Sequence, residues 1–565
     1  MRKTISKKVL SLLLALLIGL SIAACGSTAP SASTDTAGNT ASQGSEAANA
    51  GGTVDPLGKY EKPVTLSWSI MTSQVQKFHD KDTYENNQWS RLIKDKLNID
   101  LKIAFSADSS TDAYKNKLNA VIASGDLPDI FKSEDVNVFK QLQQNGQLAD
   151  LTDVFNKYAT DQVKAYQTKF ADSFNGVTID GRIYAVPRMN DNFHEASYLW
   201  IRDDWLKNTN SQPPKTMEEL VALAKKFATG DPDGNGKNGD TYGFAINKNL
   251  VQPGYATILG LVAAYGVPAY DKNVFYRDEN GKMTFSYLNP GMKPALALLH
   301  DMYAQGLLDK EFTAKDNAKQ EEDVASGKIG MAFANNWGTW YPFNMVYEKN
   351  KVITRAYPIP TAAGYNLKVG IENNATGQIT MVSSSCKNPE AAIKIWSLYE
   401  STVNSNPTDF QNYWADEQYR LSPVYTDLPN EVYAAEIQEA LKSGSDAKLS
   451  PGAKPYYKYV LDFESGADTG SNAYGTWGQM SNSGSLPIAL KYKADGAVVQ
   501  SILGADRPEV WMQNFSALET IMLTSFTDII TGAKPVDYFD TFVQNWLKAG
   551  GQKTLDELDK MYPAK

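Results

Sequence analysis

The sequence predicts an α/β fold, built from strands that alternate with helices along the chain. Short runs rich in β-branched and aromatic residues recur between longer stretches whose apolar residues follow a helical period. Alternation at this spacing is typical of an open, largely parallel sheet with helices packed on it. With 565 residues, of which 42% are hydrophobic and 11% aromatic, the chain is long enough for more than one such core.

The first alternation of strands and helices lies between residues 64 and 187. The run VTLSWSI (64–70) alternates in polarity and is expected to form the first strand. Further elements are expected as a helix around Trp89, a strand at 98–105, a helix at 114–124, a strand at 125–132, and two short helices within 138–158 that break at Asn145-Gly146. Residues 177–187 are expected to form a hairpin that turns at Asp180-Gly181.

A second alternation starts at residues 197–208 and continues to the C-terminus. Its best-marked helix, 213–229, carries a capping box at Thr216 and Glu219. Later elements are expected as a strand that runs into an aromatic loop (327–341), a strand at 377–385, a helix at 388–401, a Gly/Ser-rich loop at 474–485, helices within 508–532 and 537–551, and a second capping box at Thr554 and Glu557.

The first 24 residues are predicted to be an export signal and no part of the fold. Four cationic residues precede the run VLSLLLALLIGLSIAA, which is shorter than the roughly 20 apolar residues that span a bilayer. From Gly26 to Pro56 almost no residue can be buried, so this segment is expected to be a disordered stalk. The expected folded part therefore begins near residue 57.

Charge and cysteine content exclude several classes of function. Removal of the four signal cations takes the formal net charge from −9 to −13, and an acidic protein is a poor partner for nucleic acid. Cys25 and Cys386 are the only cysteines. A catalytic thiol needs a histidine partner, and the three histidines form no motif near Cys386, which we expect to be a small buried residue.

The stretch DPDGNGKNGDTYGF (231–244) has the oxygen spacing of a calcium-binding loop. The candidate ligands are the side chains of Asp231, Asp233, Asn235 and Asp240 and the backbone carbonyl of Lys237. Tyr242 stands where an EF-hand has its bidentate glutamate, and TYGFAIN after the loop is expected to be a strand. Because no second helix follows, a calcium-driven switch is excluded. A structural calcium site and a metal-free polar turn both remain open.

A series of phrases, in order along the chain, resembles one family. They are SGDLPDI (124–130), NGQLADLTD (145–153), DGRIYAVPR (180–188), LWIRDDWLKN (199–208), PKTMEELVALAKKF (214–227), DPDGNGK (231–237), SGKIGMAFANNWG (326–338), NPEAAIKIW (388–396) and the closing DIITGAKPVDYFDTFVQNWLKAGG. The end of the signal, Ile22-Ala23-Ala24-Cys25, is similar to a lipobox. The chain thus resembles the extracellular solute-binding lipoproteins of bacterial ABC importers, carbohydrate (family 1) type.

The resemblance implies a two-lobed periplasmic-binding-protein-like fold of type II, with a hinge that the chain crosses several times. Lobe one is expected at 57–188 plus 372–440, and lobe two at 192–366 plus 445–565. It further implies that Cys25 is acylated, as by palmitate, and anchors a monomer outside the cell membrane. Calcium would hold the loop of lobe two. The protein would bind a carbohydrate in the interlobe cleft and deliver it to the permease subunits of an importer.

Sugar rings present apolar faces and hydroxyl edges, so their sites need flat aromatic side chains and a few fixed polar groups. In open α/β sheets ligands bind beyond the carboxyl ends of strands. Residues at such positions, or in loops near the expected crossings, are Trp68, Lys132, Arg188, Asn335, Asn336, Trp337, Trp340, Tyr341, Asn374 and Trp477. We expect these residues to form the ligand site.

Two other functions share some of these features. An exported glycan-active hydrolase needs two carboxylates across the scissile bond, and no spacing among the acidic residues singles out such a pair. A ligand sensor for a surface signalling receptor would have the same fold and cannot be told apart by sequence. The collinear resemblance favours a binding protein without enzymatic activity.

Overall fold

The computed structural model describes residues 54–72, 78–109, 112–189, 196–373, 378–426, 430–504 and 507–564. All of them belong to the second of two units into which the chain divides after Thr53. The predicted signal, Cys25, nearly all of the predicted stalk and Asn374 lie outside the described residues. Within the described ranges, no helix combines the length and the apolar character that crossing a membrane requires.

Lobe one is built on a five-stranded sheet with the order β2-β1-β3-β13-β6. The strands are β1 (Val64–Thr72), β2 (Ile99–Asp108), β3 (Ile130–Ser133), β6 (Ala185–Pro187) and β13 (Ile379–Val382). β1 pairs in parallel with β2 and β3, which confirms the predicted strands and their direction. β13 runs antiparallel to β3 and β6, and it enters this sheet after the long segment that forms lobe two.

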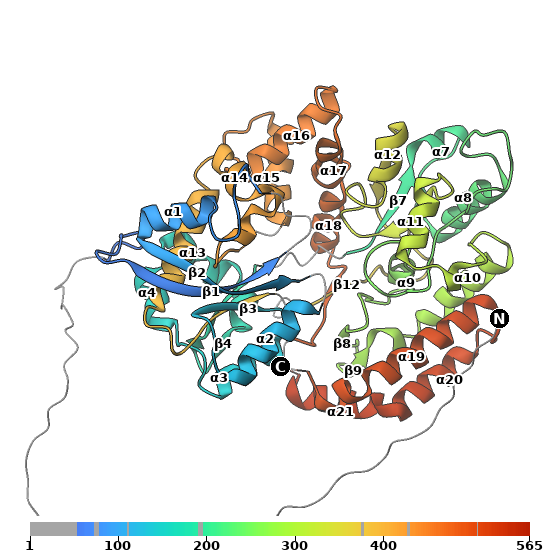
Figure 1. The fold of residues 1–565 in the computed structure, drawn as a ribbon. Coiled ribbons are helices and arrows are strands. Elements are labelled where there is room, and N and C mark those ends of the chain that lie inside the picture. The colour runs from blue at the N-terminus through green and yellow to red at the C-terminus, as the bar shows by residue number, and fades with distance from the viewer. Residues whose placement is uncertain are drawn as a thin grey trace, which may run out of the picture. The chain divides into compact units, whose positions relative to one another are not determined.

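Helices cover both faces of this sheet (Figure 1). One face carries α1 (Gln88–Leu97), α4 (Thr152–Tyr158), α5 (Asp161–Lys169) and α13 (Glu390–Val403), and the other carries α2 (Ala113–Ser124) and α3 (Val136–Gln144). Alternate side chains of a strand point to opposite faces, so in β3 Ile130 packs in the first core and Phe131 in the second. After α6 (Ala171–Asn175), β4 (Thr178–Ile179) and β5 (Arg182–Ile183) form the predicted hairpin.

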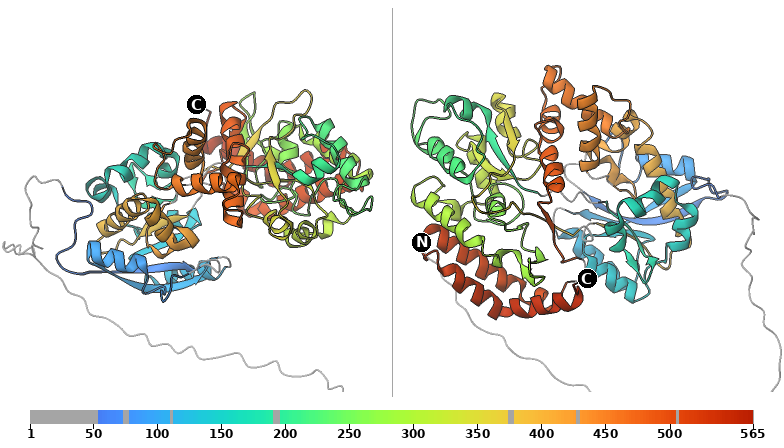
Figure 2. Two further views of the ribbon diagram at one scale, coloured as in Figure 1. Left: turned by 90° about the horizontal axis from the view of Figure 1, so that it is seen from above. Right: turned by 180° about the vertical axis from the view of Figure 1, so that it is seen from behind.

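Lobe two is built on a buried, antiparallel three-stranded sheet with the order β10-β7-β11. The strands are β7 (Tyr198–Arg202), β10 (Met331–Ala334) and β11 (Thr354–Tyr357). The helices of this lobe are α7 (Asp203–Asn208), α8 (Met217–Thr229), α9 (Leu259–Ala264), α10 (Met292–Ala304), α11 (Asn317–Ala325), α12 (Asn344–Asn350), α19 (Glu509–Thr531), α20 (Tyr538–Trp546) and α21 (Gln552–Met561). Figures 1 and 2 show α19 running beside α10, and both bury side chains in the core of this lobe.

Two short pairings and a helical cluster complete the fold. β8 (Phe275–Arg277) pairs with β9 (Met283–Phe285), and β12 (Val369–Ile371) pairs in parallel with β14 (Val498–Gln500). The helical cluster comprises α15 (Asn430–Ser443), α16 (Ala453–Ser465), α17 (Ser471–Met480) and α18 (Ser485–Ala494), with α14 (Pro407–Tyr413) beside α16. Its core includes Tyr347 of α12. The predicted lobe boundaries remain a prediction.

Two predicted elements are wrong. The segment TYGFAIN forms no continuous strand, because Tyr242, Phe244 and Ala245 each pair as a single bridge with a different partner. The predicted loop at 474–485 contains most of α17. Its glycines are not loop signals, because Gly475 and Gly478 leave room for the 336–340 segment to pack against the helix.

Of the two predicted capping boxes, Thr216 caps its helix and Thr554 does not. Thr216 caps α8, since its hydroxyl accepts a hydrogen bond from the Glu219 amide at 3.2 Å. The Glu219 carboxylate accepts from the Lys215 amide, one residue before the cap. The prediction at Thr554 is wrong, because α21 already begins at Gln552 and the Thr554 hydroxyl donates to the Gly550 carbonyl instead of capping the helix.

Candidate functional site

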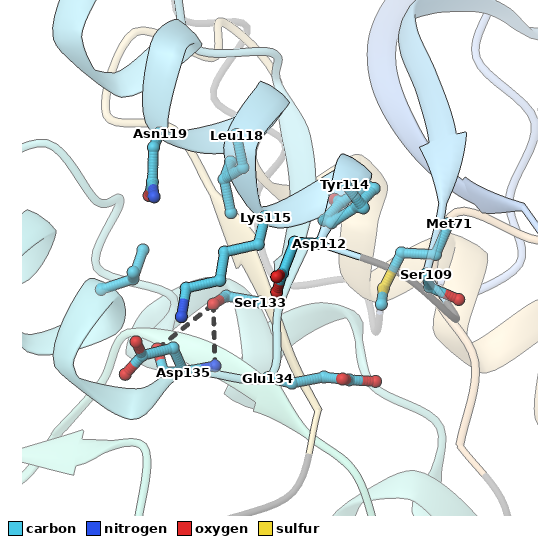
Figure 3. A pocket seen from close by; sticks show the side chains of 11 residues that line it. Met71, Ser109, Asp112, Tyr114, Lys115, Leu118, Asn119, Ser133, Glu134 and Asp135 are labelled. Carbon is cyan, nitrogen blue, oxygen red and sulfur yellow. Dashed lines mark hydrogen bonds between the residues drawn. The ribbon is translucent and has the colours of Figure 1, made fainter.

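A pocket of about 500 Å³ opens at the carboxyl ends of β1, β2 and β3 in lobe one (Figure 3). Its lining residues come from these strand ends and from the N-terminal turns of α2 and α3: Met71, Ser109, Asp112, Tyr114, Lys115, Leu118, Asn119, Ser133, Glu134, Asp135 and Val138. This edge of an α/β sheet is where ligands bind in such folds. The pocket is therefore the main candidate site within the described residues.

The pocket combines hydroxyl and carboxylate groups with a small apolar wall. The Tyr114 hydroxyl lies 2.7 Å from the Ser69 hydroxyl and donates to the Lys132 carbonyl at 3.0 Å. Burial raises the pKa of Tyr114 to about 12, so its hydroxyl stays protonated at neutral pH. Met71 and Leu118 supply the apolar surface. Such a lining suits a ligand that offers both hydroxyl groups and C–H faces.

The charged side chains of the pocket stand at its rim. Asp135 caps α3, since its carboxylate accepts from the Asn137 amide at 2.9 Å. Asp112, Lys115 and Glu134 are exposed, and Lys115 reaches from α2 toward Ser133 and Asp135 (Figure 3). Three carboxylates and one ammonium thus surround the opening, which leaves it net acidic.

The structure brings Trp68 and Lys132 together, but beneath the surface. Lys132 is only 3% exposed, and its ammonium lies 4.0 Å from the centre of the Tyr425 ring and 5.9 Å from that of Trp68. It also donates to the Ser422 carbonyl at 3.3 Å. Trp68 is 2% exposed. Lys132 stands near the end of β3, as predicted, but Trp68 lies in the middle of β1, because that strand continues to Thr72. Both residues therefore lie beneath the site.

The loop after β10 exposes part of its aromatic cluster. Trp340 is 36% exposed and Tyr341 is 37% exposed, whereas Trp337 is half-buried with its ring 6.4 Å from that of Tyr341. The two asparagines are buried and hold the loop in place. The Asn335 side chain accepts from the Gly254 amide at 3.0 Å, and the Asn336 carbonyl accepts from the Ser485 hydroxyl at 2.7 Å.

Trp477 is a core residue of the helical cluster. It is 5% exposed, stacks near Tyr474, and has the Arg355 guanidinium 4.6 Å from its ring centre. That guanidinium is in turn held by Asp203 at 2.6 Å. Its ring faces are therefore covered, so Trp477 offers no free face on which a ligand could stack.

Arg188 lies where the chain leaves lobe one. It is half-buried and follows β6, and its amide donates to the Gln378 carbonyl at 3.2 Å, just before β13 begins. It thus marks the place where one segment leaves the sheet and another returns. Asn374, predicted beside it, lies outside the described residues.

Sequence reasoning missed several residues of the pocket and its support. Glu134 and Asp135 follow β3 directly, so the strand-end argument that selected Lys132 applied to them as well. Tyr114 lies on the apolar side of α2, where a sequence pattern indicates only core. Tyr425 carries no local signal, because it reaches Lys132 from a distant part of the chain.

In the calcium-like loop, the carboxylates turn inward. Asp231 accepts from the amides of Asn235 and Gly236, both at 2.9 Å. The Asn235 side-chain amide donates to Asp233 and to Asp240, also at 2.9 Å. Burial raises the pKa of Asp233, and the carboxylates of Asp231 and Asp240 act in the same direction. The Lys237 amide donates to the Asn235 side chain at 2.8 Å.

One atom of this loop fits a cation. Oδ1 of Asp233 is buried and has no hydrogen-bond partner among the described residues. The Asn235 amide nitrogen bridges two carboxylates, a position in which a cation would satisfy both. Over the same described ranges, however, no three histidine, cysteine, aspartate or glutamate side chains form a cluster able to hold a metal ion. The loop has the oxygen donors of a calcium site without a closed shell of carboxylates.

Comparison with known proteins supports the family that the sequence resembles. A sequence model of the family described as bacterial extracellular solute-binding protein matches residues 80–396. The lipoprotein LipO of Bacillus subtilis is 25% identical over 472 residues, which are 82% of this chain and 86% of LipO.

Two solved structures share the fold. An HMO-binding, ABC-transporter-associated solute-binding protein from Bifidobacterium longum infantis has a TM-score of 0.62 at 17% identity, over 89% of this chain and 99% of that one. An EF-hand mutant of the ABC-transporter substrate-binding protein FusA of S. pneumoniae, in complex with fructo-nystose, has a TM-score of 0.56 at 19% identity, over 88% of this chain and 98% of that one. The two-lobed solute-binding fold predicted for this chain is thereby confirmed.

Proposed function

The chain belongs to the bacterial extracellular solute-binding protein family, and we propose that it captures a carbohydrate, an oligosaccharide, and delivers it to the permease of an ABC importer. The pocket at the carboxyl ends of β1, β2 and β3 is the observation that carries this proposal. Its hydroxyl, carboxylate and apolar groups match the edges and faces of a sugar ring. The complex of FusA with fructo-nystose and the HMO-binding protein support the same ligand class.

The ligand would lie in the cleft between the lobes. In this proposal the lobe-one pocket binds sugar hydroxyls through Glu134 and Asp135, and Trp340 and Tyr341 of lobe two stack on ring faces. Their exposure supports this role, since most large aromatic side chains of the described residues are buried. The protein would bind its ligand without making or breaking a bond.

The calcium-like loop would hold one structural Ca²⁺. Its ligands would be Asp231, Asp233, Asn235, Asp240 and the carbonyl of Lys237. The unpartnered oxygen of Asp233 supports this assignment, and burial, together with the nearby carboxylates of Asp231 and Asp240, raises the pKa of that carboxyl. Bound calcium would supply that charge and fix the loop after α8. FusA, whose solved structure is that of an EF-hand mutant, supports such a site.

The N-terminus would place the protein outside the cell membrane. Acylation of Cys25 after removal of the signal would supply the anchor, since stable attachment takes more than one lipid signal. LipO, named as a lipoprotein, supports this proposal.

A glycan panel tests the proposed function. Fructo-oligosaccharides, human-milk oligosaccharides, mannose-rich glycans and galacturonate oligomers are titrated against the mature protein by calorimetry. We expect at least one to bind with micromolar or tighter affinity, and Glu134→Gln to weaken it about tenfold, about 1.4 kcal/mol. Asp126→Asn, an exposed change outside the pocket, serves as the control. Absence of binding across the panel, or accumulation of cleaved product overnight, would contradict the proposal.

A further inference from the structure

Trp340 is held on two sides by a single helix, α17. On one side its indole lies against Gly475, where an added Cβ would come within 2.5 Å of Cδ2 and 2.6 Å of Cε2. On the other, its Nε1–H donates to Oε1 of Gln479 at 2.8 Å. Gly475 and Gln479 are four residues apart and therefore share one face of the helix. This face fixes both the plane and the rotation of the ring.

The support for Trp340 extends into the buried polar groups behind it. Gln479 is 7% exposed, and its amide donates to Oδ1 of Asn336 at 3.4 Å. The Thr339 hydroxyl donates to the Gly475 carbonyl at 3.1 Å. The loop that carries Trp340 is thus bonded to α17 on both sides of the ring, while 36% of the Trp340 surface stays exposed.

A flat ring serves as a stacking surface only when its orientation is set before the ligand arrives, because ordering a side chain on binding lowers affinity. We propose that Gln479 and Gly475 are positioning residues that hold the Trp340 indole in the orientation that stacks on a sugar ring. Neither residue contacts the ligand in this arrangement. The inference rests on the proposed carbohydrate site, and it names residues that no strand-end argument selects.

The central variant is Gln479→Met, which keeps the length of the side chain and removes the acceptor. Gln479→Glu keeps an acceptor for the indole. Nδ2 of Asn336 is buried without a partner in the part of the chain that the structure describes, so a flipped Asn336 amide can donate to the new carboxylate. Gln438→Met is the matched control, because Gln438 donates to the Met480 carbonyl at the end of the same helix.

Gly475→Ala tests the other side of the ring. Alanine favours a helix more than glycine does, so any effect of this change reflects displacement of Trp340 and not weakening of α17. It also covers the case in which Gln479→Met does not fold.

Two measurements are made on the mature protein labelled with 5-fluorotryptophan, with the Trp340 signal assigned by Trp340→Phe. Fluorine NMR without ligand reports the orientation of the ring, and calorimetry with the tightest-binding oligosaccharide of the panel reports affinity. We expect Gln479→Met and Gly475→Ala to shift or broaden the Trp340 line and to weaken binding about tenfold. Gln479→Glu should stay within threefold of the wild type, and Gln438→Met should match it in both measurements.

An unmoved Trp340 line in Gln479→Met, or an equal loss of affinity in Gln438→Met, overturns the inference. If the wild type binds no member of the panel, the proposed function fails, and the fluorine spectra of the unliganded variants still decide whether α17 positions the ring. A similar fall in melting temperature for Gln479→Met and Gln438→Met, with affinity lost only in the first, supports positioning over a general structural role.

Discussion

The ammonium of Lys132 lies 4.0 Å from the centre of the Tyr425 ring, in a position that is 3% exposed. A cation on an aromatic face contributes about 2 kcal/mol when water is excluded and less than about 1 kcal/mol at the surface. The contact joins the end of β3 to a segment that follows it by almost three hundred positions, and so holds that segment against this edge of the sheet.

Lys132→Met is expected to lower the free energy of unfolding by about 1–2 kcal/mol, because the variant keeps the apolar stem and loses the cation. Lys310→Met is the matched control, since the Lys310 ammonium lies 3.9 Å from the Tyr303 ring centre but on an exposed side chain. Urea unfolding at neutral pH measures both. Equal losses in the two variants would show that burial adds nothing to this contact.

Two tryptophans of the predicted site should behave in opposite ways. Trp340→Ala is expected to weaken oligosaccharide binding at least tenfold with a small loss of stability, because 36% of the side chain is exposed. Trp477→Ala is expected to cost about 3–5 kcal/mol of unfolding free energy, as for other buried aromatic residues. Calorimetry and urea unfolding on both variants separate the roles. Loss of binding in Trp477→Ala without loss of stability would return that residue to the site.

Calcium removal should expose the charge repulsion around Asp233. The pKa of this carboxyl is raised in the folded protein, so its contribution to stability is present at low pH and is lost as the pH rises through the folded pKa. In EDTA at pH 7, Asp233→Asn should therefore melt above the wild type. With free calcium at 100 times the dissociation constant, the wild type should gain about 2.7 kcal/mol and the variant almost nothing.

Differential scanning calorimetry in EDTA and in calcium measures this reversal. A wild-type melting temperature that calcium leaves unchanged, together with no calcium by elemental analysis, would rule out the site. The polar turn would then be metal-free.

Asp271 gives a second, independent pH dependence. Burial raises the pKa of its carboxyl, although Lys272 acts in the opposite direction. The folded protein then holds this proton more tightly than the unfolded chain, and the resulting stabilisation disappears as the pH rises through the folded pKa. Asparagine tolerates the φ of 43° at this position, so Asp271→Asn should not strain the backbone. The variant should be more stable than the wild type at pH 7, with a difference that shrinks toward pH 4.

Urea unfolding at several pH values checks the Asp271 prediction. Asp126→Asn, at an exposed position, is the control and should leave the pH profile unchanged. A variant at Asp271 that is less stable than the wild type at pH 7 would show that the carboxylate is stabilised by its surroundings.

Local patterns were enough to predict the strands and helices of lobe one. Leu66, Trp68 and Ile70 alternate along β1 and enter one core, as a strand buried on one face requires. The strand predicted for TYGFAIN is absent, because each of its pairings is with a different distant residue. Helix α17 was predicted to be a loop, because Gly475 and Gly478 look like loop signals. Their role is to let another segment approach the helix.

The candidate site was predictable only in part, for the same reason. The positions of Lys132 and Trp340 follow from the ends of strands that a pattern can locate. Their exposure does not, because Tyr425 covers the first and α17 positions the second. Both partners come from segments that sequence spacing cannot place beside them.

The pairing of β3 with β13 has a consequence for how the protein matures. Ser133 of β3 pairs with Ile379 of β13, which is made much later. A growing polypeptide therefore carries an incomplete sheet with an open strand edge while residues 196–373 are still being made. Such non-local closure is slow and leaves hydrophobic surface accessible to chaperones. Because β13 lies between β3 and β6, this sheet cannot be completed until residues 379–382 have been made.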